Sequence, residues 1–107
     1  MRVYVSSLNA AINPQILAYA EYRIFAALAR YSEVCQARVV LRSEPGGAVK
    51  CSVSIEDAAG STRTSATGVQ AATAIDRAAE RVRQLMRANA DRRSRHAVDR
   101  DRPAGAP

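Results

Sequence analysis

The order of its predicted segments indicates that the chain has an α+β fold: a β-α-β-β-β-α two-layer sandwich, in which a four-stranded mixed sheet carries two helices packed on one face. Four segments alternate apolar and polar residues, as half-buried strands do, at 1–7, 35–42, 48–57 and 61–67. Two longer segments, 14–31 and 69–90, repeat apolar residues at the spacing of three and four that is typical of amphipathic helices. Since the sheet and each helix have one apolar side, both helices are expected on the same face of the sheet.

The first predicted strand, Met1–Ser7, leads through a short connection into the first helix, Pro14–Tyr31. Asn13 stands where an N-cap side chain accepts a backbone N–H, and Pro14 stands where the helix needs no N–H. Because a helix joins this strand to the next one, the two strands are expected to be parallel with a right-handed crossover. The apolar stripe of the first helix consists of Ile16, Leu17, Ala20, Ile24, Ala27, Leu28 and Tyr31.

The other three strands are joined by turns and are expected to pair as antiparallel hairpins. Glycine and proline in the segment 44–47, and Gly60 in 57–61, mark the two turns. The strand at 61–67 has little to bury except Ala66 and should lie at an edge of the sheet. The positions expected to face the core are Cys35, Ala37, Val39 and Leu41 in one strand and Val49, Cys51, Val53 and Ile55 in the next.

Gly68 separates the last strand from the second helix, which is expected to run from Val69 to about Ala90. Its apolar stripe consists of Ala71, Ala74, Ile75, Ala78, Val82, Leu85 and Met86. From residue 91 to 107 the chain is rich in arginine, has no periodicity and contains almost nothing apolar. A single folded domain at 1–90, followed by a disordered basic tail at 91–107, is therefore expected.

The charge is strongly basic, with 16 Lys and Arg against 10 Asp and Glu, a formal net charge of +6 and a sequence pI of about 10.1. Lys50 is the single lysine, and arginine suits bidentate phosphate contacts and stacking on bases. A polyanion is the expected partner, with nucleic acid favoured over membrane because no strongly hydrophobic segment accompanies the charge. Two cysteines without a secretory signal indicate the reducing cytoplasm.

Two surfaces are candidates for binding RNA. The first is the outer side of the helix layer, where the candidate residues are Tyr19, Arg23, Arg30, Arg77 and Arg81. The second is the open face of the sheet, where the candidates are Arg38, Arg42 and Lys50, accompanied by Arg2, Tyr4 and Arg63. On the second helix Asp76, Glu80, Arg83 and Arg87 share a flank of their own, and Glu80 is spaced to pair with Arg83, which indicates an ordinary solvated surface there.

The residues offer little for catalysis. His96 is the one histidine and lies in the predicted tail, so no histidine-based general base or metal cluster is expected. Cys35 and Cys51 occupy positions expected to face inward, which indicates buried structural thiols, and the hairpin register keeps them too far apart for a disulfide. Gly46 and Gly47 join two strands and so do not form a phosphate-binding loop before a helix. No enzymatic activity, metal or cofactor is expected.

Four features together resemble the ribosome hibernation promoting factor family, also called ribosome-associated translation inhibitors or sigma-54 modulation proteins. The first strand runs into Ser6-Ser7-x-Asn9, and a Val/Ile hairpin surrounds a Pro-Gly turn. The second helix opens with Ala74-Ile75-Asp76 followed by spaced basic residues. The first helix contains the run Tyr22-Arg23-Ile24-x-x-Ala27-Leu28-x-Arg30-Tyr31. The match covers about residues 1–90 and resembles the short members, which lack the carboxy-terminal dimerisation domain.

The resemblance implies a non-catalytic, cytoplasmic stress factor that binds ribosomal RNA of the small subunit, between its head and body in the decoding channel, and silences idle ribosomes. It implies no membrane and no small-molecule substrate, and a monomer when off the ribosome. Two alternatives remain open. One is a generic binder of structured RNA, and the other is a protein-interaction module of the same fold that modulates transcription or stress signalling.

Overall fold

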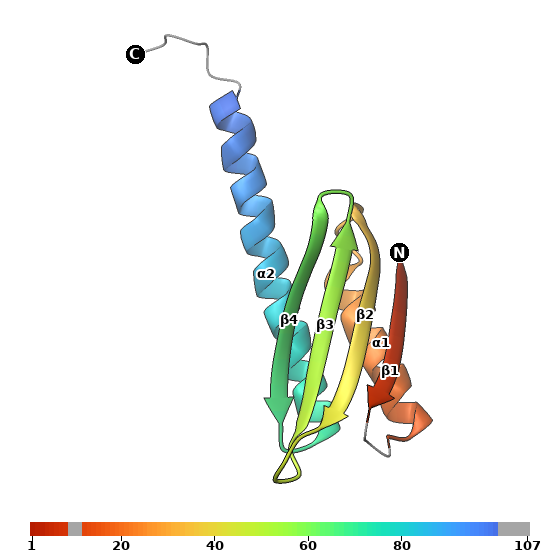
Figure 1. Ribbon diagram of the computed structural model, residues 1–107. Coiled ribbons are helices and arrows are strands. Elements are labelled where there is room, and N and C mark those ends of the chain that lie inside the picture. The colour runs from red at the N-terminus through yellow and green to blue at the C-terminus, as the bar shows by residue number, and fades with distance from the viewer. Residues whose placement is uncertain (9–11, 101–107) are drawn as a thin grey trace.

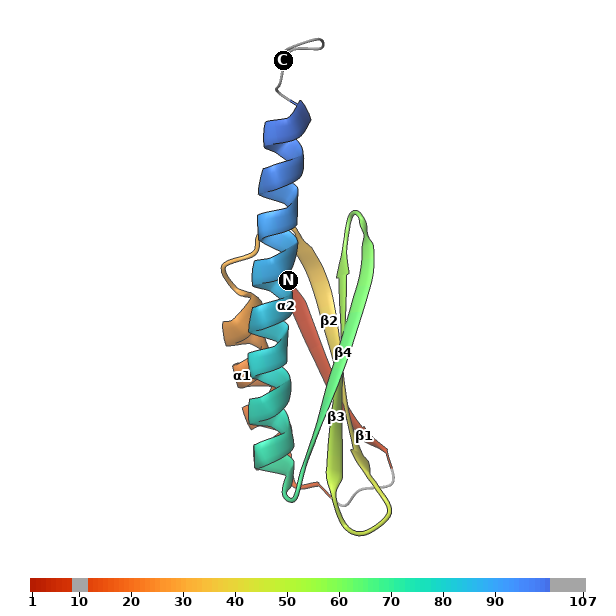
Figure 2. The same ribbon diagram turned by 90° about the vertical axis from the view of Figure 1, so that its left-hand side faces the viewer.

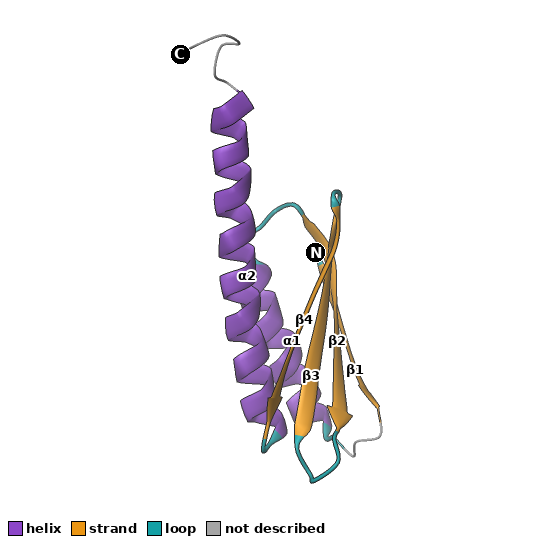
Figure 3. Ribbon diagram, turned by 60° about the vertical axis from the view of Figure 1, so that its left-hand side comes forward, coloured by secondary structure: helices purple, strands orange, loops and turns teal. Residues whose placement is uncertain are grey.

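Four strands and two helices follow one another in the order that the sequence predicts. The computed structural model describes the backbone of residues 1–8 and 12–100, and side chains as far as residue 93. Both helices lie on one face of the sheet and leave the other face open (Figures 1 and 3), which confirms the predicted fold. The elements are β1 (Arg2–Leu8), α1 (Pro14–Leu28), β2 (Val34–Ser43), β3 (Val49–Asp57), β4 (Gly60–Gly68) and α2 (Ala71–Arg100).

The sheet has the strand order β1-β2-β3-β4. Strands β1 and β2 are parallel, with Val5 opposite Val39, because α1 carries the chain back along the sheet between them. The other neighbours are antiparallel hairpins that set Val39 opposite Val53 and Val53 opposite Thr64. The edge position predicted for 61–67 is confirmed, since β4 stands last in the strand order of the described residues.

The core lies between the sheet and the helix layer. The Asn13 side chain accepts a hydrogen bond from the backbone N–H of Ile16 at 2.9 Å, and so caps α1 as predicted. The buried residues of α1 are Ala20, Ile24, Ala27 and Leu28, and those of α2 are Ala74, Ile75, Ala78, Ala79, Val82 and Met86. The facing positions of the sheet are buried as well, among them Val39, Leu41, Cys51, Val53 and Ile55.

The start of β2 corrects one sequence prediction. Cys35 was expected to face the core, but it is exposed, and Val34 is buried in its place. The register between β2 and β3 shifts between Val34 and Gln36. Such a bulge adds one residue to one strand and reverses the alternation before it. The alternation predicted for Ala37, Val39 and Leu41 starts only after this point.

Two helix ends also differ from the prediction. Helix α1 ends at Leu28, and a turn closed by the Tyr31 N–H on the Leu28 carbonyl at 2.9 Å begins the connection to β2. Helix α2 runs on to Arg100, about ten residues past the expected end, and extends beyond the sheet (Figures 1 and 2). Residues 91–100 of the disordered tail predicted at 91–107 are therefore helical in the structure, and this stretch contains no glycine or proline that would end a helix. Residues 101–107 lie outside the described residues.

The two thiols are expected to react at very different rates with a thiol reagent in native protein. Cys51 has no exposed surface, and burial raises its pKa to about 12, so almost no thiolate forms near neutral pH. Cys35 is exposed. We expect one thiol per chain to react quickly in native buffer and a second only in denaturant, and Cys35→Ser should remove the fast phase. Two fast thiols would contradict the placement of Cys51 in the core.

Candidate nucleic-acid interface

Tyr19 and Arg23 of α1 both contact the same carboxylate of α2. The Tyr19 hydroxyl donates to Asp76 Oδ1 at 2.5 Å, and Arg23 Nε lies 3.2 Å from that oxygen. The hydrogen bond to Asp76 is the main reason that the pKa of Tyr19 is raised, since losing the proton would place two negative charges side by side. Asp76 therefore ties the two helices together. Two of the predicted RNA-binding residues already have a partner within the protein.

Arg77 and Arg81 lie beside the edge strand β4. Arg77 Nη1 donates to the Thr67 carbonyl at 2.9 Å, and Arg81 Nη1 donates to the Ser65 carbonyl. The spacing of the two arginines along α2 matches the spacing of the two carbonyls along β4, because four residues of helix rise about 6 Å and two residues of strand span about 6.6 Å. The two arginines occupy carbonyls that an edge strand otherwise offers to another chain. Each guanidinium has five N–H groups and keeps donors for a further contact.

Arg30, the remaining predicted residue of the helix layer, lies at a cleft between the two helices. The cleft has a volume of about 230 Å³, and Ala26, Ala27 and Tyr31 form its apolar part. Its other lining residues are Arg83 and Arg87 of α2. Three arginines, Arg30 from the turn after α1 and Arg83 and Arg87 from α2, thus border one small cavity, which we call the arginine cleft.

Arg83 and Arg87 were not among the RNA-binding residues predicted from the sequence, because Glu80 was expected to pair with Arg83. Among the described residues, the ion pairs within 4.0 Å are Arg23–Asp76 and Arg93–Glu33, so no such pair forms. The signal available in the sequence was the spacing of four between the two arginines, which places like charges on one helix face. Their meeting with Arg30 depends on the packing of α1 against α2.

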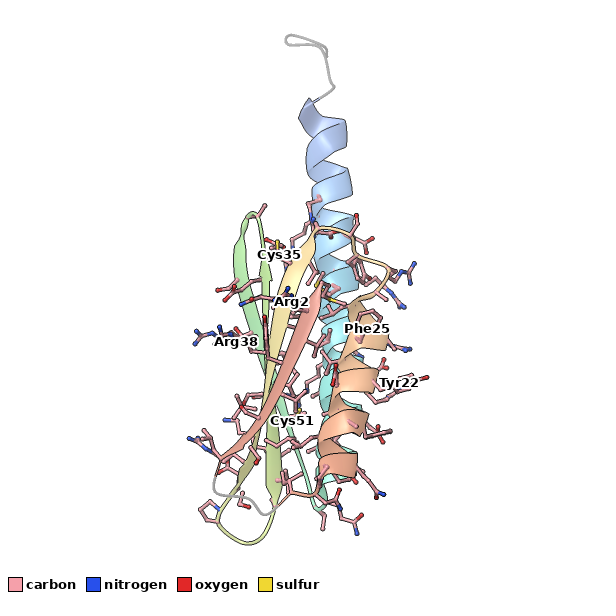
Figure 4. The ribbon with its side chains drawn as sticks, turned by 90° about the vertical axis from the view of Figure 1, so that its right-hand side faces the viewer. Arg2, Tyr22, Phe25, Cys35, Arg38 and Cys51 are labelled. Atoms are coloured by element: carbon pink, nitrogen blue, oxygen red, sulfur yellow. The ribbon has the colours of Figure 1, made fainter. Side chains whose placement is uncertain are left out.

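The three predicted residues of the sheet, Arg38, Arg42 and Lys50, all lie on its open face. The pairing places Tyr4 opposite Arg38, and Arg42 opposite Lys50. Figure 4 shows Arg38 projecting away from the helix layer. The structure therefore does not bring the eight predicted residues together: Arg38, Arg42 and Lys50 lie on the open face of the sheet, and the other five belong to the helix layer, with Arg77 and Arg81 at the β4 edge.

The described part of the chain provides no cluster of three or more His, Cys, Asp or Glu side chains able to hold a metal ion. Among the described helices, none has the length and apolar character needed to cross a membrane. What the two surfaces offer is arginine, a few hydroxyl groups and exposed aromatic rings. These groups bind anions and planar rings.

The comparisons with known proteins give structural neighbours only. No family model and no curated protein matches the sequence. The structure of a ribosomal subunit interface protein from Coxiella burnetii superposes with a TM-score of 0.73 at 11% identity, covering 84% of this chain and 99% of that one. The N-terminal domain of Protein Y from Thermus thermophilus superposes with a TM-score of 0.62 at 26% identity, covering 78% and 94%.

The first neighbour is too distant in sequence to show more than the fold, whereas the second shares about a quarter of its aligned residues with this chain. Both are members of the hibernation promoting factor family. The resemblance to that family, predicted from the motifs of α1 and α2, is confirmed by these neighbours.

Proposed function

Starting from this resemblance to the ribosome hibernation promoting factor family, we propose that the protein binds the small ribosomal subunit in the decoding channel and inhibits translation by idle ribosomes. The observation that carries the proposal is the likeness to both neighbours: the chain shares 26% identity with the N-terminal domain of Protein Y over 78% of its length, and it shares the fold of a ribosomal subunit interface protein over 84% of its length. In this role the protein acts in the cytoplasm, as a monomer when off the ribosome, and performs no chemistry.

The arginine cleft is the proposed contact of the helix layer with ribosomal RNA. Arg30, Arg83 and Arg87 are exposed and border one cavity, and like charges brought together in this way favour an anion between them. A phosphate in the cleft would accept several charge-assisted hydrogen bonds at once. Tyr19 and Arg23 hold α1 against α2, and Arg77 and Arg81 reach RNA with the donors that β4 leaves open.

Replacing Arg30, Arg83 and Arg87 together by alanine is expected to weaken co-sedimentation with purified small subunits and to abolish inhibition of a cell-free translation reaction. The dependence of log K on log salt should flatten by roughly 0.7–0.9 for each phosphate that the variant no longer binds. Since all three side chains are exposed, the melting temperature should stay close to that of the wild type.

The matched control replaces the same three residues by lysine. Lysine keeps the charge and loses the planar fork, so the salt dependence should remain while the affinity falls by less than in the alanine variant. A wild-type protein that never sediments with small subunits, even at low salt, would disprove the proposed function. Release from subunits by an excess of duplex RNA would favour the generic RNA binder.

A further inference from the structure

We propose that the open face of the sheet is a second RNA-binding surface and that it takes single-stranded RNA, independently of the arginine cleft. That the partner is RNA rests on the proposed function. The inference adds a second contact with RNA, on the face of the sheet that the helices leave open. A protein with both surfaces holds two RNA segments at once, one against the helices and one against the sheet.

The strand register arranges the open face in rows that cross the sheet. The Arg38 row consists of Tyr4, Arg38, Ser54 and Arg63, and the Arg42 row of Leu8, Arg42, Lys50 and Thr67. Arg38 and Arg42 are four residues apart on one strand, so the two rows lie roughly 13 Å apart. Each row carries two positive charges, so the face offers two separate positions for phosphates of one strand.

Between these cationic rows lies a row of small side chains, Ser6, Val40, Ser52 and Ser65. A hollow of about 760 Å³ opens here, and its lining includes Arg38, Arg63, Val40 and the hydroxyl-bearing residues Ser52, Ser54 and Ser65. The small side chains leave room for a planar base, and the hydroxyl groups can donate to or accept from its edge.

Tyr4 and Arg38 form a stacking platform beside the hollow. The Arg38 guanidinium carbon lies 5.8 Å from the centroid of the Tyr4 ring, and Tyr4 is 46% exposed. Bases stack on aromatic rings and on guanidinium planes only when they are not stacked in a duplex. The combination of a cationic surface with such a platform favours a single strand over double-stranded RNA.

Glu56 limits the surface at one end. Its carboxylate lies at the edge of the hollow and accepts a hydrogen bond from Gln36 Nε2 at 2.8 Å. Glu56 belongs to the row next to the Arg38 row, with Gln36 and Ser61, and its negative charge repels a phosphate backbone. Removing this charge should therefore tighten RNA binding, an effect opposite in sign to that of removing an arginine.

The test is fluorescence anisotropy with a labelled uridine decamer at low salt. Tyr4→Ala should weaken binding roughly 5- to 150-fold, the range for loss of one base–aromatic stack, and Tyr4→Phe should bind like the wild type.

Replacing Arg38 and Arg63 by alanine should lower the salt slope of decamer binding by roughly 0.7 for each phosphate that is no longer bound. Glu56→Gln should bind more tightly. In the variant with Arg30, Arg83 and Arg87 replaced by alanine, adding Tyr4→Ala should weaken binding of the decamer by the same factor as in the wild type.

Other results would overturn the inference. Equal affinity of Tyr4→Ala and wild type, or equal affinity for a duplex of the same length, would show that no base stacks on the sheet. An acidic peptide that displaces the decamer as well as unlabelled RNA does would indicate a protein partner instead. Small-subunit sedimentation separates the two proposals: decamer binding without sedimentation removes only the proposed function, and sedimentation without Tyr4-dependent decamer binding removes only this inference.

Discussion

Replacing Ile24 by alanine is expected to lower the free energy of unfolding by about 2–5 kcal/mol. Ile24 has no exposed surface and lies one turn before the end of α1, in the core shared with α2 and the sheet. The substitution removes three carbon atoms from the side chain and leaves a cavity that the surrounding core fills only in part. Since a domain of this size is stable by only about 5–15 kcal/mol, a large part of its stability would be lost.

Phe25 supplies the matched control for this experiment, because it follows Ile24 in the same helix and is 48% exposed (Figure 4). Phe25→Ala removes more atoms and should nevertheless destabilise the protein less. Urea unfolding followed by circular dichroism measures both changes. A loss below about 0.5 kcal/mol for Ile24→Ala, the range typical of surface substitutions, would contradict the assignment of the buried face of α1.

Gly68→Ala is expected to destabilise the protein by about 1–3 kcal/mol, and toward the upper end of that range. A Cβ atom at this position would lie 2.6 Å from the backbone nitrogen of Ala74 and 2.9 Å from the Cβ of Thr73. The first of these is backbone of α2, which cannot rotate away as a side chain does. Relief of the contact requires a shift of the start of α2 relative to the end of β4.

The neighbouring Thr67→Ala is the control, because Thr67 is exposed and its change should stay within about 0.5 kcal/mol. Thermal unfolding of the two variants beside the wild type measures the difference. The shift in Gly68→Ala would also separate Arg77 from the Thr67 carbonyl that it binds. Equal melting temperatures for Gly68→Ala and wild type would contradict the close approach of Gly68 to Thr73 and Ala74 at the start of α2.

Local sequence patterns were sufficient to predict the order of the elements and most of the core. Alternation in β3 and the three-and-four spacing in both helices assign each side chain to a face before any contact is known. The capping of α1 by Asn13 is local in the same sense. The excess of arginine, and with it the expectation of an anionic partner, follows from composition alone.

Packing between the elements, in contrast, determines what the individual arginines do. Tyr19 and Asp76 are 57 positions apart, and their hydrogen bond depends on how α1 packs against α2. Packing also turns Arg77 and Arg81 toward β4 and brings Arg83 and Arg87 to the cleft that Arg30 borders. The bulge that exposes Cys35 arises from pairing between two strands. Periodicity fixes the side of an element on which a residue lies, whereas its partner is fixed by distances between elements, which no local pattern contains.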